Sequence, residues 1–363
     1  MSPQLDAIVV GAGPAGAMAA HRLGAAGAQV RVLEAAELPR TKPCGGGILG
    51  LSRRPLPVDI VDLVDAQVGR CLRLYDHQRP VWQPVGDLTF VDRAAFDLQL
   101  IDSACSRYPS VVLETGARVR EVDVQETGVR VRTECGRAFR SKFLVAADGV
   151  YSRTARCLGL NRRPLVAAAM DVEMEVTPEA WQRESAQATF NHFCIADGYA
   201  WIFPKRPGRL SCGIGSWRRR HRVPAAMGEF LARSFRPGEI LQQTKLGYPI
   251  PLYRDQRPIA TARVCLAGDA ASLVEPVMGE GIRFALISGD LAGRAVADCL
   301  AGHATDCLPY QKAVQDRFAN SFFDLSRFIL PVLLQAPETF YRKFIEGGAN
   351  YHRLAAALGS RLD

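Results

Sequence analysis

Features of metal proteins, secreted disulfide proteins and membrane-spanning proteins are missing from this chain of 363 residues. Its ten cysteines form no C-x-x-C pair and do not pair with any of the six histidines at zinc spacing, so no metal site is expected. No apolar run reaches the ~18 residues that a membrane-spanning helix needs. An apolar segment begins already at Ala7, which leaves no room for a signal peptide. These absences predict a cytoplasmic protein with reduced thiols.

Basic motifs with interleaved aromatic residues, which are typical of nucleic-acid binders, are also absent. The net charge is +8, from 45 Lys and Arg against 37 Asp and Glu, and the arginines are spread along the chain. Such a balance favours anionic ligands such as phosphates, or an anionic membrane surface. We therefore expect no nucleic-acid partner, while peripheral contact with the inner face of a membrane stays open.

The start of the chain has the pattern of a strand, a glycine turn and a helix. The apolar residues 7–10 precede the motif Gly11-x-Gly13-x-x-Gly16. Gly11 permits a tight turn, Gly13 lets the backbone approach a pyrophosphate, and Gly16 lets helix and strand pack closely. The motif predicts a nucleotide-binding βαβ unit, and by itself it does not decide which dinucleotide binds.

The residues after the turn complete this unit. A helix beginning near Pro14 and Ala15 would point free N–H groups and the positive end of its dipole at the phosphates. A second strand ends at Glu34, about 20 residues further on, where a carboxylate can accept a hydrogen bond from a ribose hydroxyl.

Further along the chain, strand-like and helical patterns alternate. Asp92 is a candidate N-cap for a helix over 93–107, and residues 119–133 have the pattern of a hairpin. Residues 165–217 are strand-like without helices between the strands, which predicts an antiparallel sheet. A short helix over 225–234 follows, and Pro249-Ile250-Pro251 indicates a break.

We therefore predict an α/β fold in which a β-rich domain is inserted into a nucleotide-binding domain. A helical region is expected at the C-terminus. The expected bounds are 1–75, 91–164 and 255–300 for the discontinuous nucleotide-binding domain, 76–90 and 165–254 for the β-rich substrate-binding domain, and 301–363 for the C-terminal region.

Two later acids end predicted buried strands. They lie in Asp148-Gly149 and Gly268-Asp269, and ligands of open α/β sheets bind outside the carboxyl ends of strands. Asp269 could hold a ribityl hydroxyl, and a helix opening at Gly279 could direct its N–H groups at an electron-rich ring oxygen. The alternative is that both acids are only helix caps.

These three glycine and aspartate motifs, in this order, resemble the flavin enzymes of the p-hydroxybenzoate hydroxylase fold. The resemblance covers nearly the whole chain and implies a Rossmann-like domain that binds FAD in an extended form. Three further features resemble the geranylgeranyl reductase family. They are Arg40-x-Lys42-Pro43-Cys44-Gly45-Gly46-Gly47, then Tyr199-x-Trp201-x-Phe203-Pro204-Lys205, and Asp92-Arg93 with Phe96-Asp97.

The resemblance implies a set of cofactor-binding residues along the whole FAD molecule. They are Gly11, Gly13, Pro14, Ala15, Gly16, Glu34, Arg40, Cys44, Gly45, Gly46, Gly47, Arg93, Val119, Asp148, Gly268, Asp269, Gly279, Gly281 and Ile282. The chain departs from the family pattern after Lys205, because one additional residue precedes Gly213. A longer hairpin turn would explain this departure.

Tyr199, Trp201 and Phe203 alternate, so their side chains share one face of a strand. They are either half of a hydrophobic core or the wall of an apolar substrate tunnel, and with the family motif we favour the tunnel. Lys205 lies on the same face and is expected to contact a substrate phosphate or to stay solvated. Cys44, by resemblance near the flavin face, either donates a proton or packs; Cys44, Tyr199 and Trp201 are the predicted catalytic residues.

The leading hypothesis is an FAD-dependent reductase that saturates C=C bonds of a polyprenyl lipid or prenyl diphosphate, with NADPH or ferredoxin as electron donor. A flavin monooxygenase or halogenase on the same fold is the second hypothesis. Halogenases carry a related W-x-W-x-I-P signature, and Tyr199 and Phe203 replace two of its positions, which argues against a halogenase. A non-catalytic lipid-binding flavoprotein is the third.

Three other features have competing interpretations. The run from Arg218 to Arg222 is either a solvated loop or a site for a pyrophosphate or lipid phosphates. The Phe-rich C-terminal segment either lies on a membrane or packs on the sheet. His192 is a candidate acid, for which a structural role is favoured.

Overall fold

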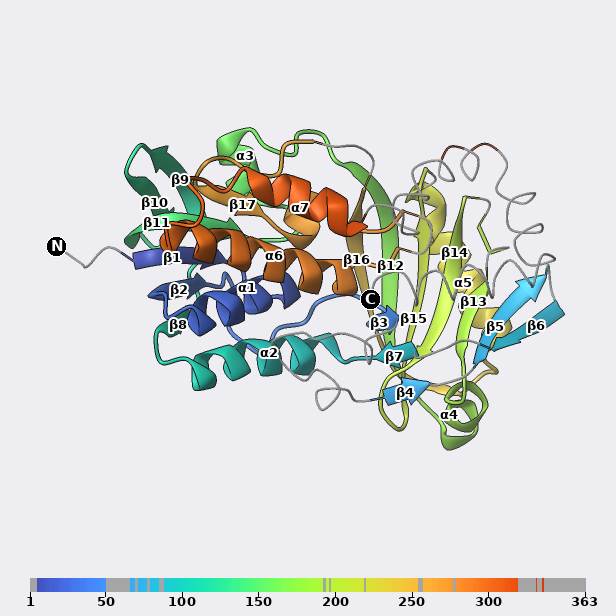
Figure 1. Cartoon of the computed structure of the whole chain (residues 1–363). Coiled ribbons are helices and arrows are strands. Elements are labelled where there is room, and N and C mark those ends of the chain that lie inside the picture. The colour runs from blue at the N-terminus through green and yellow to red at the C-terminus, as the bar shows by residue number, and fades with distance from the viewer. Residues whose placement is uncertain are drawn as a thin grey trace.

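The computed structural model describes most of the chain, and Figure 1 shows its arrangement. The described residues are 5–49, 66–68, 71–76, 79–84, 88–191, 194–195, 197–218, 220–253, 257–276 and 279–318, with 331 and 335. Their elements form an α/β fold with two seven-stranded sheets and one small three-stranded sheet. The predicted fold class is thus confirmed, whereas the domain bounds stay a prediction.

The first sheet has the order β8-β2-β1-β11-β10-β9, and β17 pairs with β11. Its strands β1, β2, β8, β11 and β17 are parallel to their neighbours among this group, while β9 and β10 form the expected antiparallel hairpin. The strand bounds are β1 (Leu5–Val10), β2 (Val30–Leu33), β8 (Val111–Glu114), β9 (Val119–Gln125), β10 (Gly128–Thr133), β11 (Ala138–Ala146) and β17 (Val264–Leu266).

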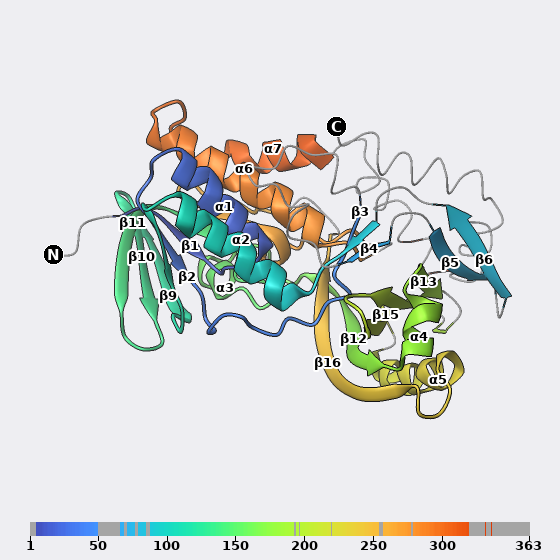
Figure 2. The same cartoon turned by 90° about the horizontal axis from the view of Figure 1, so that it is seen from below.

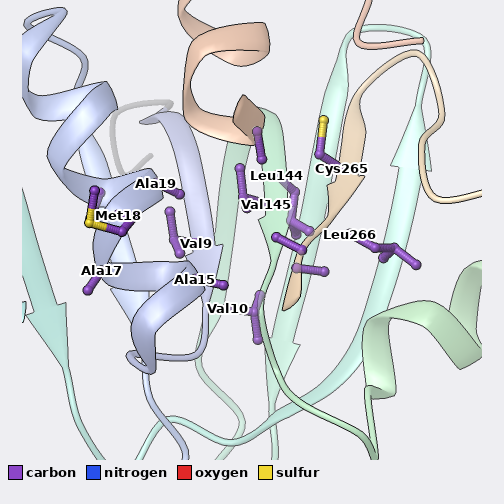
Figure 3. Packing of buried hydrophobic residues seen from close by; sticks show 14 of the residues in the cluster. Val9, Val10, Ala15, Ala17, Met18, Ala19, Leu144, Val145, Cys265 and Leu266 are labelled. Carbon is purple, nitrogen blue, oxygen red and sulfur yellow. The ribbon is translucent and has the colours of Figure 1, made fainter. Parts of the chain in front are cut away.

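Helices cover this sheet, and their apolar faces form its core (Figure 3). Val9 and Leu144 of the sheet and Met18 of α1 are fully buried in it. α1 packs so closely on α6 that a Cβ atom at Gly289 would lie 2.1 Å from the Ala15 carbonyl oxygen. The helix bounds are α1 (Pro14–Ala25), α2 (Arg93–Arg107), α3 (Arg153–Leu158), α6 (Ile282–Leu300) and α7 (Pro309–Phe318), with a 3-10 helix at Gly268–Ala271.

The second large sheet has the order β16-β12-β15-β14-β13-β5-β6. Its pairs are antiparallel except β5 with β13. Alternate residues of β12, β14 and β15 pack against α5 in a second core, which leaves the other face for the site described below. The bounds are β5 (Cys71–Asp76), β6 (Arg79–Pro84), β12 (Leu165–Val176), β13 (Ala188–Asn191), β14 (Gly198–Pro204), β15 (Arg209–Ser216), β16 (Ile240–Leu252), α4 (Pro178–Glu184) and α5 (Val223–Ser234), with a 3-10 helix at Arg220–Arg222.

Seen from below, the two large sheets lie at opposite ends of the molecule, and the segment after β2 runs from one towards the other (Figure 2). This segment enters the small sheet, of order β3-β7-β4. The bounds are β3 (Gly47–Leu49), β4 (Ala66–Val68) and β7 (Leu88–Phe90). Residues 34–46 therefore connect β2 of the first sheet to β3 of the small sheet.

The structure corrects two sequence predictions and refines one helix boundary. A helix, α4, interrupts the strands of 165–217: Thr177 caps it through the Ala180 N–H, and Pro178 occupies its first turn, a start signal that the strand pattern obscured. Within the same strand-like region, β13 ends at Asn191. The short helix expected over 225–234 is present and begins at Val223. Pro249 and Pro251 do not end a strand, because β16 is an edge strand, where a missing N–H is tolerated.

Several expectations lie outside the described residues. They are residues 53–65, whose sequence has a short, weak helical pattern, together with His192, Arg219 and the Phe-rich segment beyond Phe318. Among the described helices, none combines the length and apolar composition needed to cross a bilayer. In the same part of the chain, no group of three or more His, Cys, Asp or Glu side chains is arranged to hold a metal ion.

Candidate active site

The glycine turn lies at the carboxyl ends of β1 and β2, as its sequence predicts. Gly11 has φ +96 and donates its N–H to the Leu33 carbonyl oxygen at 2.8 Å. A Cβ atom there would lie 2.4 Å from the Ala147 oxygen, so only glycine fits. α1 begins at Pro14 without a side-chain cap on its N-terminal N–H groups. The turn therefore offers free backbone donors where a pyrophosphate can approach.

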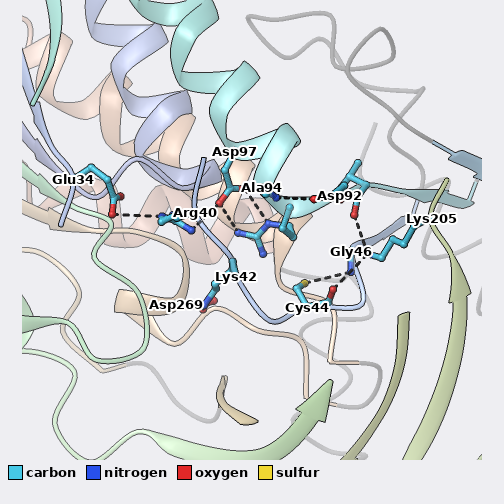
Figure 4. Close-up of polar contacts among 12 residues, drawn as sticks. Glu34, Arg40, Lys42, Cys44, Gly46, Asp92, Ala94, Asp97, Lys205 and Asp269 are labelled. Atoms are coloured by element: carbon cyan, nitrogen blue, oxygen red, sulfur yellow. Dashed lines mark hydrogen bonds and ion pairs between the residues drawn. The ribbon is translucent and has the colours of Figure 1, made fainter. Parts of the chain in front are cut away.

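Glu34 is buried beside this turn and organises it (Figure 4). Its Oε2 accepts the Ala12 N–H at 2.8 Å, and its Oε1 accepts the Ala36 N–H at 3.1 Å. Arg40 lies 3.4 Å from Oε1. Val119, which opens β9, follows shortly after Ala117, whose N–H donates to the Glu34 carbonyl oxygen at 2.8 Å. The residues predicted for the adenosine end thus lie together.

A buried ion-pair cluster connects Arg40 to the next part of the site. Arg40 Nη1 lies 3.3 Å from Asp97 Oδ2, and Arg93 donates to both oxygens of Asp97 at 2.9 and 3.0 Å. Asp92 caps α2 by accepting the Ala94 N–H at 3.0 Å, as predicted. Although burial opposes it, the Asp97 carboxylate raises the pKa of Arg93. Both arginines are held in fixed positions facing Gly13 and Cys44.

Lys42 and Asp269 meet across the site from opposite ends of the sequence (Figure 4). Their Nζ and Oδ2 atoms lie 3.8 Å apart, and Nζ lies 3.4 Å from the centre of the Tyr248 ring. Burial lowers the pKa of the Lys42 ammonium to about 8. Asp269 follows Gly268, whose N–H donates to Ser288 Oγ at 2.9 Å. A desolvated cation beside a single carboxylate favours a further anionic group at this position.

The two carboxyl oxygens of Asp148 differ in role: one caps a helix, and the other is available to a ligand. Its Oδ2 accepts the N–H groups of Arg153 and Thr154 at 2.8 and 3.0 Å, so it caps the region of α3. Its Oδ1 is buried and has no hydrogen-bond partner. A buried acceptor that is left unpaired costs free energy, so this atom suits a ligand hydroxyl.

The side chain of Lys205 binds the backbone of the loop of residues 44–46. The Lys205 ammonium, on a residue only 3% exposed, donates to the carbonyl oxygens of Gly45 at 2.6 Å, Val91 at 2.9 Å and Cys44 at 3.4 Å. The expectation that Lys205 is solvated or contacts a substrate phosphate is therefore wrong. Its donors are used by the backbone, because the loop presents two carbonyl oxygens to it and Val91 a third.

Backbone geometry explains the glycine at the end of this loop. Gly46 has φ +71, and a Cβ atom there would lie 2.2 Å from the Val91 oxygen. Its N–H donates to Cys44 Sγ at 3.4 Å, and the Arg93 guanidinium also hydrogen-bonds that sulfur. Since two donors already point at the sulfur, the thiol hydrogen is directed elsewhere.

The predicted aromatic face is present and packs directly on the loop. Tyr199, Trp201 and Phe203 are each less than 10% exposed, and the Trp201 and Phe203 rings stack at 6.1 Å between centres. A Cβ atom at Gly45 would lie 2.8 Å from the Phe203 ring and 3.0 Å from Trp201 Nε1. The loop backbone thus lies against the rings, where a side chain would collide.

β14 and β15 pair in a regular antiparallel register. Trp201 pairs with Gly213, and Tyr199 pairs with Gly215. A Cβ atom at Gly213 would lie 1.8 Å from Trp201 Cζ2, so the indole occupies the space that a side chain would fill. The turn between the two strands, where a longer hairpin turn was expected, includes Gly208 with φ +78.

The residues that precede α6 lie beside Tyr199. A Cβ atom at Gly279 would lie 3.0 Å from the Tyr199 hydroxyl, and one at Gly281 would lie 3.8 Å from Asp269 Oδ1. α6 then begins at Ile282 without a side-chain cap. Burial raises the pKa of the Tyr199 phenol. The two ends of the predicted cofactor site are therefore joined by a continuous row of predicted residues.

Sequence reasoning missed three polar residues beneath the aromatic face. Asp171 accepts the Cys44 N–H at 3.3 Å and the Ser211 hydroxyl at 2.7 Å. Ser211 in turn accepts the Trp201 indole N–H at 3.4 Å. Glu173 lies on the same side of β12 and hydrogen-bonds Asp171. The alternation of two acids in the apolar strand 170–174 was the available signal.

Comparison with known proteins agrees with this geometry. The model of the FAD binding domain family matches residues 4–49. Digeranylgeranylglycerophospholipid reductase 2 of Methanopyrus kandleri is 28% identical over 333 residues, with 88% of this chain and 83% of that protein covered. The chain is an FAD-dependent oxidoreductase related to the geranylgeranyl reductases. The menaquinone reductase of Mycobacterium tuberculosis is 27% identical to the enzyme, with 79% and 75% covered.

Solved structures show the same fold. A geranylgeranyl bacteriochlorophyll reductase-like protein of Thermoplasma acidophilum superposes on the enzyme with a TM-score of 0.81 at 21% identity, covering 99% and 96% of the two chains. A flavin-dependent brominase gives 0.77 at 18% identity, covering 99% and 95%. At these identities the superpositions establish the fold, and they do not choose between reduction and halogenation.

The residues of this structure fit FAD. The turn that admits no Cβ atom, the uncapped start of α1, the desolvated Lys42 ammonium and the unpaired Asp148 oxygen all call for an extended, anionic ligand with hydroxyl groups. The cofactor is therefore FAD. Which atoms of FAD each residue contacts is a proposal and follows below.

Proposed function

We propose that the enzyme saturates C=C bonds of a polyprenyl chain. The observation that carries this proposal is the contact of the 44–46 loop with the buried rings of Trp201 and Phe203. It puts a thiol, a phenol and an apolar aromatic face at one end of the cofactor row. The names of the related reductases support a polyprenyl substrate.

We assign the cofactor contacts along this row. Gly11, Gly13 and the start of α1 face the pyrophosphate, with Arg40 and Lys42 as its cationic partners. Glu34 and the backbone near Val119 serve the adenosine, and Asp269 and Asp148 serve hydroxyl groups. Residues 44–46 and the turn 279–282 enclose the ring. Arg93 acts on the ring end through Cys44, which it hydrogen-bonds.

When bound and reduced, FAD supplies a hydride. An isolated alkene is a poor hydride acceptor, so the chain must stabilise the positive charge that develops on the carbon that accepts the hydride while the second carbon takes up a proton, and it must exclude water. The faces of Trp201 and Phe203 perform the first task, because an aromatic face carries negative partial charge. The low exposure of Tyr199, Trp201 and Phe203 performs the second.

The second carbon needs a proton, and two residues hold one at this place. Burial raises the pKa of Tyr199 and so keeps its phenol protonated at neutral pH. The Cys44 sulfur accepts from Gly46 and Arg93, so its own hydrogen is free to point at the substrate. Transfer of one hydride and one proton adds two hydrogen atoms per bond.

The electron donor and the membrane contact stay predictions. NADPH or ferredoxin would supply the electrons, and an anionic membrane surface would present the lipid to a chain of net charge +8. Arg218 and His221 are exposed beyond β15, which is compatible with such a surface.

The test is anaerobic incubation of the reduced holoenzyme with geranylgeranyl lipids, geranylgeranyl diphosphate and menaquinone, followed by mass spectrometry. Products heavier by steps of two hydrogens are expected. No mass gain with any of these prenyl substrates would contradict the proposal, and an oxygenated or halogenated aromatic product under oxygen would favour the alternative.

A further inference from the structure

The face of the second sheet that carries Trp201 also carries a pair of acids, of which Asp171 is buried and Glu173 is partly exposed. Asp171 and Glu173 are two residues apart on β12, so both side chains leave the strand on the side opposite α5. The two carboxyl groups interact with each other. Like charges at close range disfavour ionisation of both, so one shared proton is the favourable state.

The pair is connected to both parts of the candidate site. Asp171 accepts the backbone N–H of Cys44 at 3.3 Å and the hydroxyl of Ser211 at 2.7 Å. Ser211 holds the Trp201 indole N–H at 3.4 Å. One carboxylate thus fixes both the loop that faces the cofactor and the ring that faces the substrate.

The charges around the pair balance one ionised carboxyl group better than two. Lys205 faces both acids, and its ammonium is already bound to the oxygens of Cys44, Gly45 and Val91. Arg209 of β15 also faces Glu173, whereas Asp92 at the start of α2 adds negative charge. A second ionised carboxylate would repel Asp171 within a buried site.

We propose that Asp171 and Glu173 share a single proton behind the 44–46 loop and act as positioning residues for Cys44 and Trp201. With one proton, Asp171 keeps both the Cys44 N–H and Ser211. With none, the repelled carboxylates separate, and the loop and the indole lose their common anchor. The position of the loop and the indole therefore depends on pH. Its effect on catalysis rests on the proposed function, whereas the shared proton does not.

The titration has a defined direction. Burial, together with the Asp171 carboxylate, raises the pKa of Glu173 to about 7, so the shared proton is lost as the pH rises through neutrality. Because the folded pKa lies above the usual value of 4.5, this group lowers the free energy of unfolding as the pH rises from about 4.5 to about 7.

The experiment compares the wild-type holoenzyme with Glu173→Gln, Asp171→Asn and the control Glu175→Gln, which changes an exposed acid on the same strand. Infrared spectra recorded across neutrality report the C=O band of a protonated carboxyl group. We expect a band that disappears with rising pH in the wild type and in Glu175→Gln, that is absent in Glu173→Gln, and that titrates at lower pH in Asp171→Asn. A band of wild-type intensity in Glu173→Gln would overturn the shared proton.

The positioning role of the pair is tested by pH profiles of kcat and KM and by tryptophan fluorescence. In the wild type, kcat should fall through neutral pH with little change in KM, and fluorescence should change in parallel; both should be flat in Glu173→Gln. Profiles that are the same in both proteins would overturn the positioning role. If the infrared and fluorescence changes occur but no prenyl substrate is reduced, the proposed function fails and the proton pair stands.

Discussion

Replacing Gly213 by alanine should displace the Trp201 indole. The added methyl carbon would lie 1.8 Å from Cζ2, 2.1 Å from Cε2 and 2.4 Å from Cη2 of that ring, whereas carbon atoms pack best at about 3.5–4.0 Å. The ring cannot give way freely, because Ser211 holds its nitrogen and Phe203 stacks on it. Overpacking of this kind costs about 1–3 kcal/mol of unfolding free energy.

Gly215 offers a matched control on the same strand. A Cβ atom there would meet nothing closer than the Ala168 oxygen at 3.9 Å, and neither glycine has a positive φ. Gly215→Ala should therefore be neutral or stabilise by up to about 1 kcal/mol. The difference between the two variants isolates the indole from the general effect of a methyl group in a strand.

Denaturant unfolding and single-turnover lipid reduction are the two assays. We expect Gly213→Ala to unfold at lower denaturant and to reduce substrate about 100-fold more slowly, since a shift of about 1 Å at a reacting centre has that effect. In the double variant with Trp201→Phe, which removes the overlapping ring atoms, the stability losses should be less than additive. If Gly213→Ala matches Gly215→Ala in stability and rate, the packing argument is wrong.

Three further predictions concern the loop and the cofactor row. Gly45→Ala would place a methyl group 2.8 Å from the Phe203 ring and should slow substrate reduction by more than tenfold with FAD still bound, whereas Gly228→Ala on exposed helix surface should not; equal rates would contradict the loop contact. Glu34→Gln loses the charge that binds the Ala12 and Ala36 N–H groups and should weaken FAD binding about tenfold in equilibrium titration, with Glu126→Gln as control. Lys42→Met should stabilise the apoprotein at neutral pH and weaken FAD binding, because a lysine whose pKa is lowered to about 8 penalises folding while protonated. That penalty is relieved as the pH rises from about 8 to about 10.5, so the gain over wild type should shrink in that window, and a pH-independent gain, or one shared by the exposed Lys245→Met, would refute it.

The parts of the fold that could be predicted are those where one local pattern has one structural solution. The strand, glycine turn and helix at residues 7–25 could be predicted because Gly11 and Gly16 leave no room for side chains. Asp92 could also be predicted as a helix cap, because an aspartate before a helix accepts a free N–H group of the first turn. α4 was missed because its short start signal at Thr177 lies within a long strand-like region.

The candidate site shows a different limit. Motifs placed Cys44 and Trp201 in the site, yet they gave no means of seeing that Lys205 binds three backbone oxygens, two of them in that loop. Asp171 and Ser211 come from neighbouring strands and meet only through the register of β12 and β15. Contacts made by pairing distant segments are invisible to a reading of periodicity and spacing.

The central claim is that the enzyme reduces polyprenyl C=C bonds, and anaerobic lipid profiling tests it most directly. The holoenzyme is expressed in a host that makes geranylgeranylated lipids, beside a Trp201→Ala variant that still binds FAD. The account predicts lipids heavier by two hydrogens per reduced bond with the wild type, and far less of this product with the variant. Unchanged lipids in the presence of a reduced, FAD-loaded enzyme would contradict it.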